Sequence, residues 1–437
     1  MNLLKTIGLV ALLIAAATAK PKSKNIAAST ASLKPTDWLS AAELRALPAG
    51  EDITLQQLEN MSVEEGERLI QKIYHLSKID HTLRPTYVPS AGNVPVILVK
   101  PNSKSVETNL NEMVHQAKQQ PNFGSQEVTI IITGLPQTSP AVAKANKKLV
   151  QAYIQRYHGQ QQPVRGSNMD YASGEQQQAA TSSEEDYSES WKEQKQNRGD
   201  LVIINLGATL TNMRRYALLD VEQTGELIGK ALVQLTNEVD VPQEIIHIVG
   251  QGIGAQVAGA AARQYKRLTG HKIRRITALD PAKLYATDKK VLTGLARGDA
   301  DFVDAIHTST GGMGTRERVG DVDFYVNGPA AIVPGADNVV EASMRATRYF
   351  AESVRPGNER NFAAVPANSK RQYDNNEGNG RRAYMGIATE YDLKGDYVLN
   401  VNAQSPFGKS APAQKQTPYH SLHQAWRSDK LSNSRYE

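Results

Sequence analysis

Residues 245–254 read Ile-Ile-His-Ile-Val-Gly-Gln-Gly-Ile-Gly, an apolar run that ends in closely spaced glycines. The run is rich in β-branched residues, which favour a buried strand. Residues 255–262, Ala-Gln-Val-Ala-Gly-Ala-Ala-Ala, begin an alanine-rich pattern that continues to Gly270, as a helix would. The stretch predicts a strand, a sharp turn and a helix of small side chains that can lie close to the sheet. His247 is interpreted as a buried, hydrogen-bonded core histidine.

Further apolar runs of strand length surround this one, with helical patterns between them. The runs are 96–99, 128–132, 201–206, 273–279 and 302–308. A helical pattern of apolar residues extends from Leu227 to Leu235. Apolar strands that alternate with helices are typical of a largely parallel sheet covered by helices on both faces. We therefore predict an α/β fold.

The turn after residue 249 has the outline of the nucleophile elbow of serine hydrolases, Gly-x-Ser-x-Gly, which presents a serine hydroxyl above the sheet. In this chain the central position is Gly252, which has no nucleophilic atom. Glycine adopts the unusual backbone angles of such a turn without strain. The sequence therefore keeps the form of a catalytic turn and lacks the group that would do the chemistry.

A serine hydrolase also needs a carboxylate and a histidine after the nucleophile. Asp280 follows the predicted strand 273–279 and stands where an orienting acid belongs. An aspartate that only forms a strand-end turn is an equally good interpretation. Among the later histidines, His307 ends a predicted strand and is interpreted as structural, and His420 and His423 lie in a polar tail.

The N-terminus has the features of a secretory signal peptide. Lys5 precedes an apolar stretch at 7–17, and Ala17-Thr18-Ala19 forms a small-residue cleavage site. We predict cleavage before Lys20 and secretion. No later stretch approaches the ~18 apolar residues that a membrane span needs, so we expect no transmembrane segment.

The composition excludes several classes of function. The 437 residues include no cysteine, which excludes thiol catalysis, cysteine-ligated metals and a disulfide scaffold. The net charge of +5 is not concentrated in a Lys/Arg block with interleaved aromatic residues, so we expect no nucleic-acid partner. The residues indicate no cofactor and no metal.

Composition also divides the chain into segments. We predict an N-terminal extension at 20–90 that is partly helical, with apolar residues at helical spacing between 69 and 76. The main domain spans 91–407. A glutamine-rich and acidic insert at 155–199 interrupts it and is predicted to be disordered. The remaining 408–437 form a polar C-terminal tail.

Three kinds of modification are predicted in this secreted chain. Tyr187 lies in the acidic stretch 182–189, a setting that favours tyrosine sulfation, although a plain solvated acidic loop is the alternative. A mass increment of one sulfate on this peptide would distinguish the two. Ser182 and Ser183 precede acidic residues and are candidates for phosphorylation. Asn60 begins an Asn-Met-Ser glycosylation sequon.

Residues 245–283 together resemble the segment from elbow to acid in the animal lipase family, which includes the pancreatic and lipoprotein lipases. The stretches 302–308, 320–328 and 397–407 resemble the same family, and the similarity covers roughly residues 90–407. The resemblance implies an α/β-hydrolase fold, with a mostly parallel sheet and helices on both faces.

The resemblance also assigns catalytic positions in this sequence. The family's nucleophile falls at Gly252, its acid at Asp280 and its histidine at Ser343. The backbone N–H groups of Leu135 and Ile253 fall at the positions of the oxyanion donors. The resemblance therefore implies a vestigial triad in which only the acid remains, and no catalytic residue.

Three features narrow the resemblance to the yolk proteins (vitellogenins) of higher flies. They are the stretch 53–61, the acidic insert around Tyr187 and residues 355–360. This resemblance implies a secreted, non-enzymatic storage protein that an oocyte receptor takes up into yolk granules for the embryo. Other yolk protein subunits are the further partners it implies.

Two alternatives remain open. The vestigial pocket is a candidate site for a lipid or a steroid ester, which would make the protein a carrier. An active lipase would need another nucleophile, such as Ser309 or Ser343, and removal of the nucleophile alone costs about 10⁶ in turnover in serine hydrolases. The missing base argues further against an active lipase.

Overall fold

The computed structural model describes residues 53–79, 84–100, 105–159, 199–287, 292–329 and 332–409. The signal peptide, the modification candidates Ser182, Ser183 and Tyr187, and the tail beyond residue 409 lie outside these ranges. Among the helices of the described part, none is long and apolar enough to cross a membrane.

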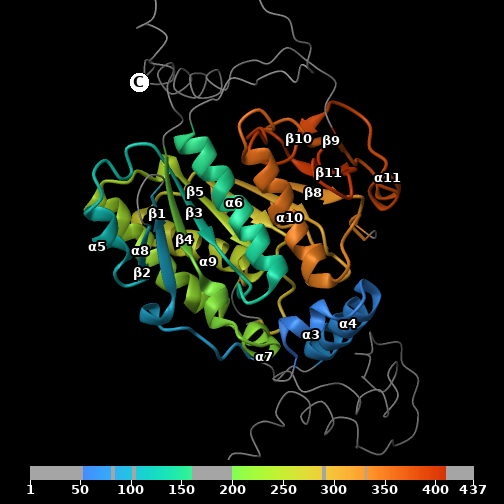
Figure 1. The fold of residues 1–437 in the computed structure, drawn as a ribbon, viewed down its shortest axis with the longest axis horizontal. Coiled ribbons are helices and arrows are strands. Elements are labelled where there is room, and N and C mark those ends of the chain that lie inside the picture. The colour runs from blue at the N-terminus through green and yellow to red at the C-terminus, as the bar shows by residue number, and fades with distance from the viewer. Residues whose placement is uncertain are drawn as a thin grey trace, which may run out of the picture.

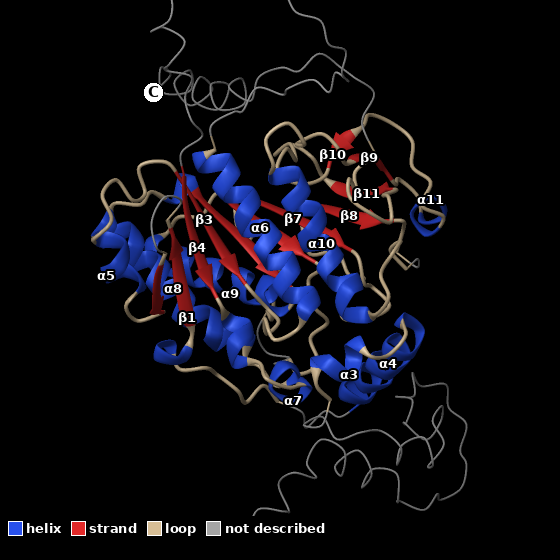
Figure 2. Cartoon of the chain, viewed as in Figure 1, coloured by secondary structure: helices blue, strands red, loops and turns tan. Residues whose placement is uncertain are grey.

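A sheet of 11 strands runs through the molecule (Figures 1 and 2). Its strands are β1 (Pro95–Val99), β2 (Val106–Asn109), β3 (Glu127–Ile132), β4 (Gly199–Ile204), β5 (Ile246–Gln251), β6 (Arg275–Leu279), β7 (Phe302–His307), β8 (Val322–Val326), β9 (Ala363–Pro366), β10 (Ala383–Tyr384) and β11 (Gly395–Leu399). The order is β10-β9-β11-β8-β7-β6-β5-β3-β4-β1-β2. From β4 to β11 in this order every pair is parallel, and antiparallel pairs finish both edges.

Helices cover both faces of the sheet. They are α3 (Leu55–Glu59), α4 (Val63–Ile79), α5 (Met113–Lys118), α6 (Pro140–His158), α7 (Met213–Ala217), α8 (Val221–Val239), α9 (Ile253–Thr269), α10 (Val339–Val354) and α11 (Lys370–Asp374). In Figure 1, α6 and α10 lie in front of the sheet, and α8 and α9 lie behind it. The predicted α/β fold with a mostly parallel sheet is confirmed.

The continuous apolar runs are explained by burial on both faces. In β3, Ile130 and Ile132 belong to the core that α8 and α9 cover, and Ile131 belongs to the core that α6 and α10 cover. All three are almost fully buried. Successive side chains of a strand point to opposite faces, so a strand covered on both sides has no polar face.

At the first predicted boundary of the insert, 155, α6 has not yet ended, and the second, 199, coincides with the first residue of β4. The helix α6 continues through His158, and β4 already begins at Gly199. The last turn of α6 is held by contacts distant in sequence, because the buried Tyr157 hydroxyl donates to Glu127 at 2.8 Å and bonds Thr129 at 2.7 Å. The polar composition of the sequence from residue 155 onward gave no sign of these contacts.

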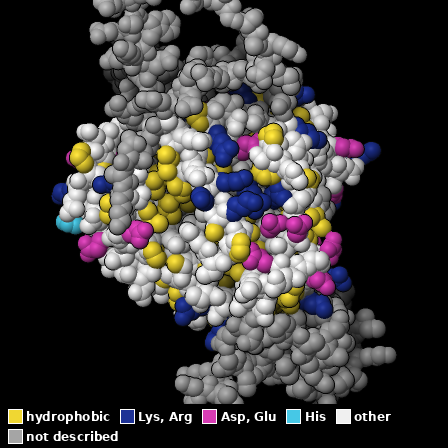
Figure 3. Space-filling model, viewed as in Figure 1, with side chains coloured by type: hydrophobic (Ala, Val, Ile, Leu, Met, Phe, Trp, Pro, Cys, Tyr) yellow, Lys and Arg dark blue, Asp and Glu magenta, His cyan; other side chains and the backbone are white. Residues whose placement is uncertain are grey.

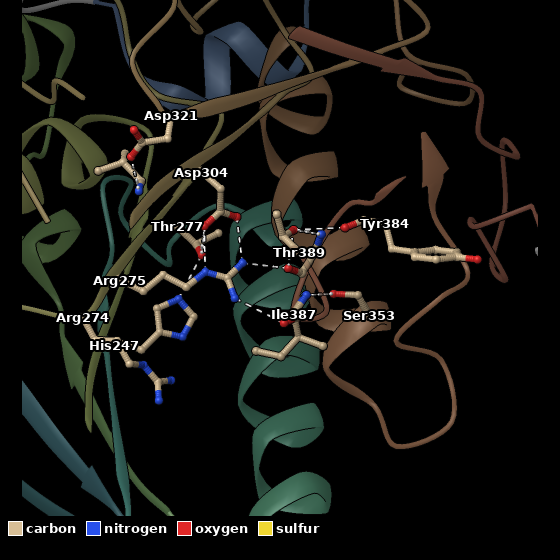
Figure 4. A network of polar contacts seen from close by, with 12 residues as sticks. His247, Arg274, Arg275, Thr277, Asp304, Asp321, Ser353, Tyr384, Ile387 and Thr389 are labelled. Carbon is tan, nitrogen blue, oxygen red and sulfur yellow. Dashed lines mark hydrogen bonds and ion pairs between the residues drawn. The ribbon is translucent and has the colours of Figure 1, made fainter. Parts of the chain in front are cut away.

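A buried ion pair joins the middle of the sheet to a loop near its edge (Figure 4). Arg275 in β6 donates to both carboxylate oxygens of Asp304 in β7, at 2.7 and 2.9 Å. The same guanidinium donates to the carbonyls of Gly386 and Ile387 at 2.8 and 3.2 Å. Burial lowers the pKa of Arg275, but the Asp304 carboxylate outweighs this effect and raises it.

His247 lies beside this pair, as Figure 4 shows, and is the buried core histidine that the sequence predicted. The Thr277 hydroxyl donates to Asp304 at 2.9 Å and lies 2.9 Å from the His247 Nε2. Because that hydroxyl has already given its proton to Asp304, it accepts from the imidazole, which therefore carries a proton on Nε2. Burial and the neighbouring Arg275 hold the pKa of His247 well below its usual range, so the ring is neutral.

Positive charge gathers on one face, although the sequence shows no basic block. Figure 3 shows Lys and Arg side chains clustered in the centre of the face that α6 and α10 form. Partial burial lowers the pKa of Lys148, and the nearby charges of Arg348, Lys144 and Arg355 lower it further. The cluster forms because two helices far apart in sequence lie side by side.

We predict that Arg275→Met lowers the free energy of unfolding by about 3–5 kcal/mol, because it leaves Asp304 charged and unpaired in the core. Arg297→Met is the matched control, since Arg297 pairs with Asp321 but is 61% exposed. Its loss should stay below about 1 kcal/mol. Urea unfolding of the two variants measures both changes, and equal losses would contradict the assignment.

Candidate functional site

Gly252 forms the turn between β5 and α9 and has φ +54° and ψ −119°, a conformation that L residues rarely adopt. Its N–H donates to the Leu279 carbonyl at 2.9 Å, and its carbonyl accepts from the Ala282 N–H at 3.1 Å. A Cβ placed at residue 252 would lie 3.7 Å from the Tyr216 hydroxyl, the nearest heavy atom outside the immediate chain. The turn therefore keeps the shape and the space of a nucleophile elbow, without a nucleophile.

The end of β3 lies directly against this turn. A Cβ at Gly134 would be 2.1 Å from the Gln251 carbonyl oxygen and 3.0 Å from the Ile253 nitrogen. A Cβ at Gly254 would be 2.4 Å from the carbonyl oxygen of Ile132. Glycine is therefore required at both positions. This close approach brings the loop that carries Leu135, the other predicted oxyanion donor, beside the elbow.

Tyr216 in α7 occupies the space in front of the elbow, and the sequence gave no sign of it. Its side chain is buried, and its hydroxyl lies 3.7 Å from the position of a Cβ at residue 252. Burial raises the pKa of Tyr216 well above its usual value, and Tyr285 and Asp280 add to the rise. The hydroxyl is therefore a neutral group that faces the turn where the predicted oxyanion donor Ile253 begins α9.

Asp280 follows β6 and is completely buried. Its Oδ1 accepts from the N–H groups of Thr308 and Ser309 at 2.9 and 2.8 Å, and its Oδ2 accepts from the Ser309 hydroxyl. A Cβ at Gly314 would lie 2.4 Å from Oδ1, so the loop 308–314 wraps closely around the carboxylate. The carboxylate holds a loop where, in a hydrolase, it would orient a histidine.

Ser343 lies in α10 and is buried. Its carbonyl accepts from the hydroxyl of Thr308 at 3.4 Å, and the N–H of Thr308 binds Asp280. The structure therefore brings Gly252, Asp280 and Ser343 to the same edge of the sheet. A serine hydroxyl is no general base at neutral pH, so this position does not replace a histidine.

His307, the other histidine that sequence reasoning considered, has a structural environment. It ends β7, its Nε2 lies 2.9 Å from Asp323 Oδ1, and its Nδ1 lies 3.0 Å from the Thr315 carbonyl. Its ring stacks on Tyr325 with centroids 4.4 Å apart. These contacts fix β7 to β8 and the following loop, and they leave the ring no role at the elbow.

Lys283 holds the loop around Asp280 from the other side, a role that sequence reasoning missed. Its Nζ donates to the carbonyls of Thr310, Gly312 and Gly314 at 2.8, 2.5 and 2.7 Å. Burial lowers the pKa of Lys283 to about 8, against the opposing effect of Asp280 and Glu67. The stretch Asp280-Pro281-Ala282-Lys283 places the lysine close to the acid in sequence, but it does not indicate which carbonyls the lysine binds.

Gln251, at the residue before the elbow, is also committed to packing. Its amide donates to Asn146 in α6 at 2.8 Å and to Thr347 in α10 at 3.1 Å. In the described part of the chain, no group of three His, Asp or Glu side chains is arranged to hold a metal ion. In the described structure, the three positions that the resemblance assigns hold a glycine at 252, the Asp280 carboxylate bonded to the loop 308–314, and the buried Ser343.

Comparison with known proteins finds a lipase family model and relatives among vitellogenins and phospholipases. The family model described as Lipase matches residues 104–407. The chain is 72% identical over 435 residues to Vitellogenin-1 of Ceratitis capitata, covering 99% of this chain and 100% of that protein. It is 57% identical over 404 residues to Vitellogenin-3 of Drosophila melanogaster, covering 91% and 94%. It is 39% identical over 151 residues to Phospholipase A1 member A of Rattus norvegicus, covering 33% and 32%.

We predict that Gly252→Ser folds but loses about 1–3 kcal/mol of unfolding free energy, because serine must adopt a strained φ and ψ. Steric overlap should add little, since the nearest heavy atom to the new Cβ, the Tyr216 hydroxyl oxygen, is 3.7 Å away. Gly270→Ser is the control: Gly270 has φ +79° and ψ −10°, with no atom within 4 Å of its Cβ. Its cost should be about 1 kcal/mol. Thermal or urea unfolding checks both, and a cost at residue 252 no larger than the control would contradict the strain.

Proposed function

The chain belongs to the lipase family and, within it, to the fly vitellogenins or yolk proteins, and on this premise we propose that it is a non-enzymatic protein reserve for the embryo. Ester hydrolysis in this family's fold needs a nucleophile and a base at the carboxyl edge of the sheet. Here those two positions hold Gly252 and Ser343. The paired loss of both groups is the observation that carries the proposal.

The surroundings of the elbow support the same conclusion. The buried side chain of Tyr216 lies in front of Gly252, with its hydroxyl 3.7 Å from the position where the Cβ of a nucleophile would be. Ser309, the nearest alternative nucleophile, donates its proton to Asp280 and accepts from the Gly314 N–H at 2.9 Å. A carboxylate is a much weaker base than an imidazole, so this serine is not activated for attack.

A lipid or steroid-ester carrier is the second function considered, and the packing of the site does not favour it. At the carboxyl edge Asp280 and Ser343 are buried, and the buried Tyr216 side chain lies in front of Gly252. A carrier would need an apolar cavity at this edge. Storage of amino acids needs no such cavity, so the packing supports the reserve alone.

The proposed route follows from the yolk-protein relationship. The chain is secreted, assembles with other yolk protein subunits, and enters the oocyte by binding a receptor. Asn60 is exposed at the end of α3, so its glycosylation sequon is accessible. Sulfation of Tyr187 and phosphorylation of Ser182 and Ser183 remain predictions, because these residues lie outside the described part.

We expect the purified protein to show no esterase or phospholipase activity above buffer and no labelling by a fluorophosphonate probe. The reason is the absence of an activated serine, since loss of the nucleophile alone costs about 10⁶ in turnover. An active phospholipase A1 assayed in parallel is the positive control. Stoichiometric labelling of Ser309 or Ser343 would contradict the proposal.

We expect fluorescently labelled protein to enter vitellogenic follicles by a saturable process. A large excess of unlabelled protein should abolish uptake, because both compete for one receptor, and serum albumin at the same concentration should not. Confocal imaging should then place the label in yolk granules. Uptake that does not saturate, or that albumin suppresses equally, would count against the storage role.

A further inference from the structure

Residues 53–79, here called the N-terminal cap, lie on the carboxyl edge of the sheet. Figure 1 shows α3 and α4 beside α7 and the lower end of α10. The cap bonds the loops that follow β3, β4, β6 and β7, which are the loops that surround the elbow. The contacts are Ser139 to Glu59, the Met213 N–H to the Ile53 carbonyl at 3.1 Å, Lys78 to the Leu284 carbonyl at 2.7 Å, and Gln71 to the Gly311 carbonyl at 2.6 Å.

The cap shares the hydrophobic core of the main domain. Ile53, Leu58, Val63 and Ile70 are each at most 5% exposed and belong to the same core as β3 and β5. Such burial on one face of two helices removes much apolar surface from water. The cap is therefore an integral layer of the fold.

The backbone of α4 approaches the start of α10 closely. A Cβ at Gly66 would lie 2.9 Å from Val339 Cγ1 and 3.5 Å from Val339 Cβ. One turn further along α10 lies Ser343. On the other side of α4, the Glu67 carboxylate fits against Gly311, where a Cβ would come within 2.4 Å of it. The glycine at residue 66 allows α4 to lie this close to Val339, and at Gly311 the end of the Glu67 side chain occupies the space of the missing Cβ.

The cap is also connected to the group that fills the elbow. The helix α7 begins at Met213, whose N–H binds the cap at Ile53, and it carries Tyr216. The Tyr216 hydroxyl is the nearest heavy atom to the position of a side chain at residue 252, at 3.7 Å from its Cβ. Tyr285, which lies beside Tyr216, packs edge-on against Tyr74 of the cap, with centroids 5.8 Å apart.

We propose that the chain fills its own former ester-binding crevice: Tyr216 occupies the space in front of Gly252, and the N-terminal cap closes the entrance. The inference rests on the proposed loss of catalysis and deepens it. Ligands of open α/β sheets bind at the carboxyl ends of the strands. This chain has put its own residues there, so an acyl ester has no access to the elbow.

A single cysteine at the elbow reports access directly, because the chain has no other thiol. Gly252→Cys places that thiol at the N-terminus of α9, where its pKa falls and its reactivity rises if reagent can reach it. Gly270→Cys, at the other end of the same helix with open space around it, is the matched control. We expect a disulfide reagent to modify the elbow thiol at least about 100-fold more slowly than the control thiol.

Releasing the cap should expose the elbow. Gly66→Leu, which must displace α4 from Val339, should speed modification of the Gly252→Cys thiol at least about tenfold. Tyr216→Ala should also speed modification of the Gly252→Cys thiol, because it removes the phenol ring that lies in front of residue 252. Gly92→Leu is the control for the added side chain, because Gly92 is exposed and its Cβ would meet only Asn111 Nδ2, at 3.4 Å. It should leave the rate unchanged.

A cysteine pair tests the cap without altering the elbow. In Gly66→Cys/Val339→Cys the two Cβ atoms would be 3.5 Å apart, within the range of disulfides. We expect mild oxidation of the folded pair to consume both thiols, while each single variant keeps its thiol.

The outcomes separate the two proposals. An elbow thiol that reacts as fast as the Gly270→Cys control, or thiols that persist in the folded oxidised pair, would overturn the self-filled crevice and leave storage untouched. Esterase activity or failed oocyte uptake would overturn storage, and neither result measures access to the elbow.

Discussion

Backbone contact between the end of β3 and the turn after β5 is the constraint on which the carboxyl edge of the sheet depends. At Gly134 and Gly254 a Cβ would come within 2.4 Å of a carbonyl oxygen, so no side chain fits between the two segments. Gly252 supplies the positive φ that turns the chain into α9. Because this geometry is built from backbone, it survives the loss of the nucleophile. The turn is required for packing whether or not it catalyses.

Groups that would serve catalysis have acquired packing roles at this edge. The Asp280 carboxylate accepts from Thr308 and Ser309 and so closes a loop. The buried Tyr216 side chain packs in front of the elbow at Gly252. A hydrolase must keep such groups free for a transition state and accepts some instability in return. A protein that only has to fold, travel and be digested has no such requirement, and here these groups are paired within the fold.

Buried charges with several partners hold the loops of a chain that has no cysteine. Arg275 joins two strands to the loop at Gly386, and Lys283 gathers three carbonyls of the loop around Asp280. Removing one member of such a network leaves a buried group uncompensated. These networks connect the loops without disulfides, so proteolysis needs no reductant to take the fold apart, which suits the proposed reserve.

The sequence by itself determined the parallel sheet, the elbow, the missing nucleophile and the structural roles of His247 and His307. Each follows from residue type within one short stretch, because strand period, glycine spacing and the absence of an atom are local properties. Only the tertiary structure decided that α6 continues to His158, that Tyr216 fills the elbow and that the N-terminal helices close the edge. Those facts depend on contacts between segments that lie far apart in the sequence. The hydrogen bond between Met213 and Ile53 is one example. A short polar or aromatic segment carries no local mark of the distant surface against which it packs.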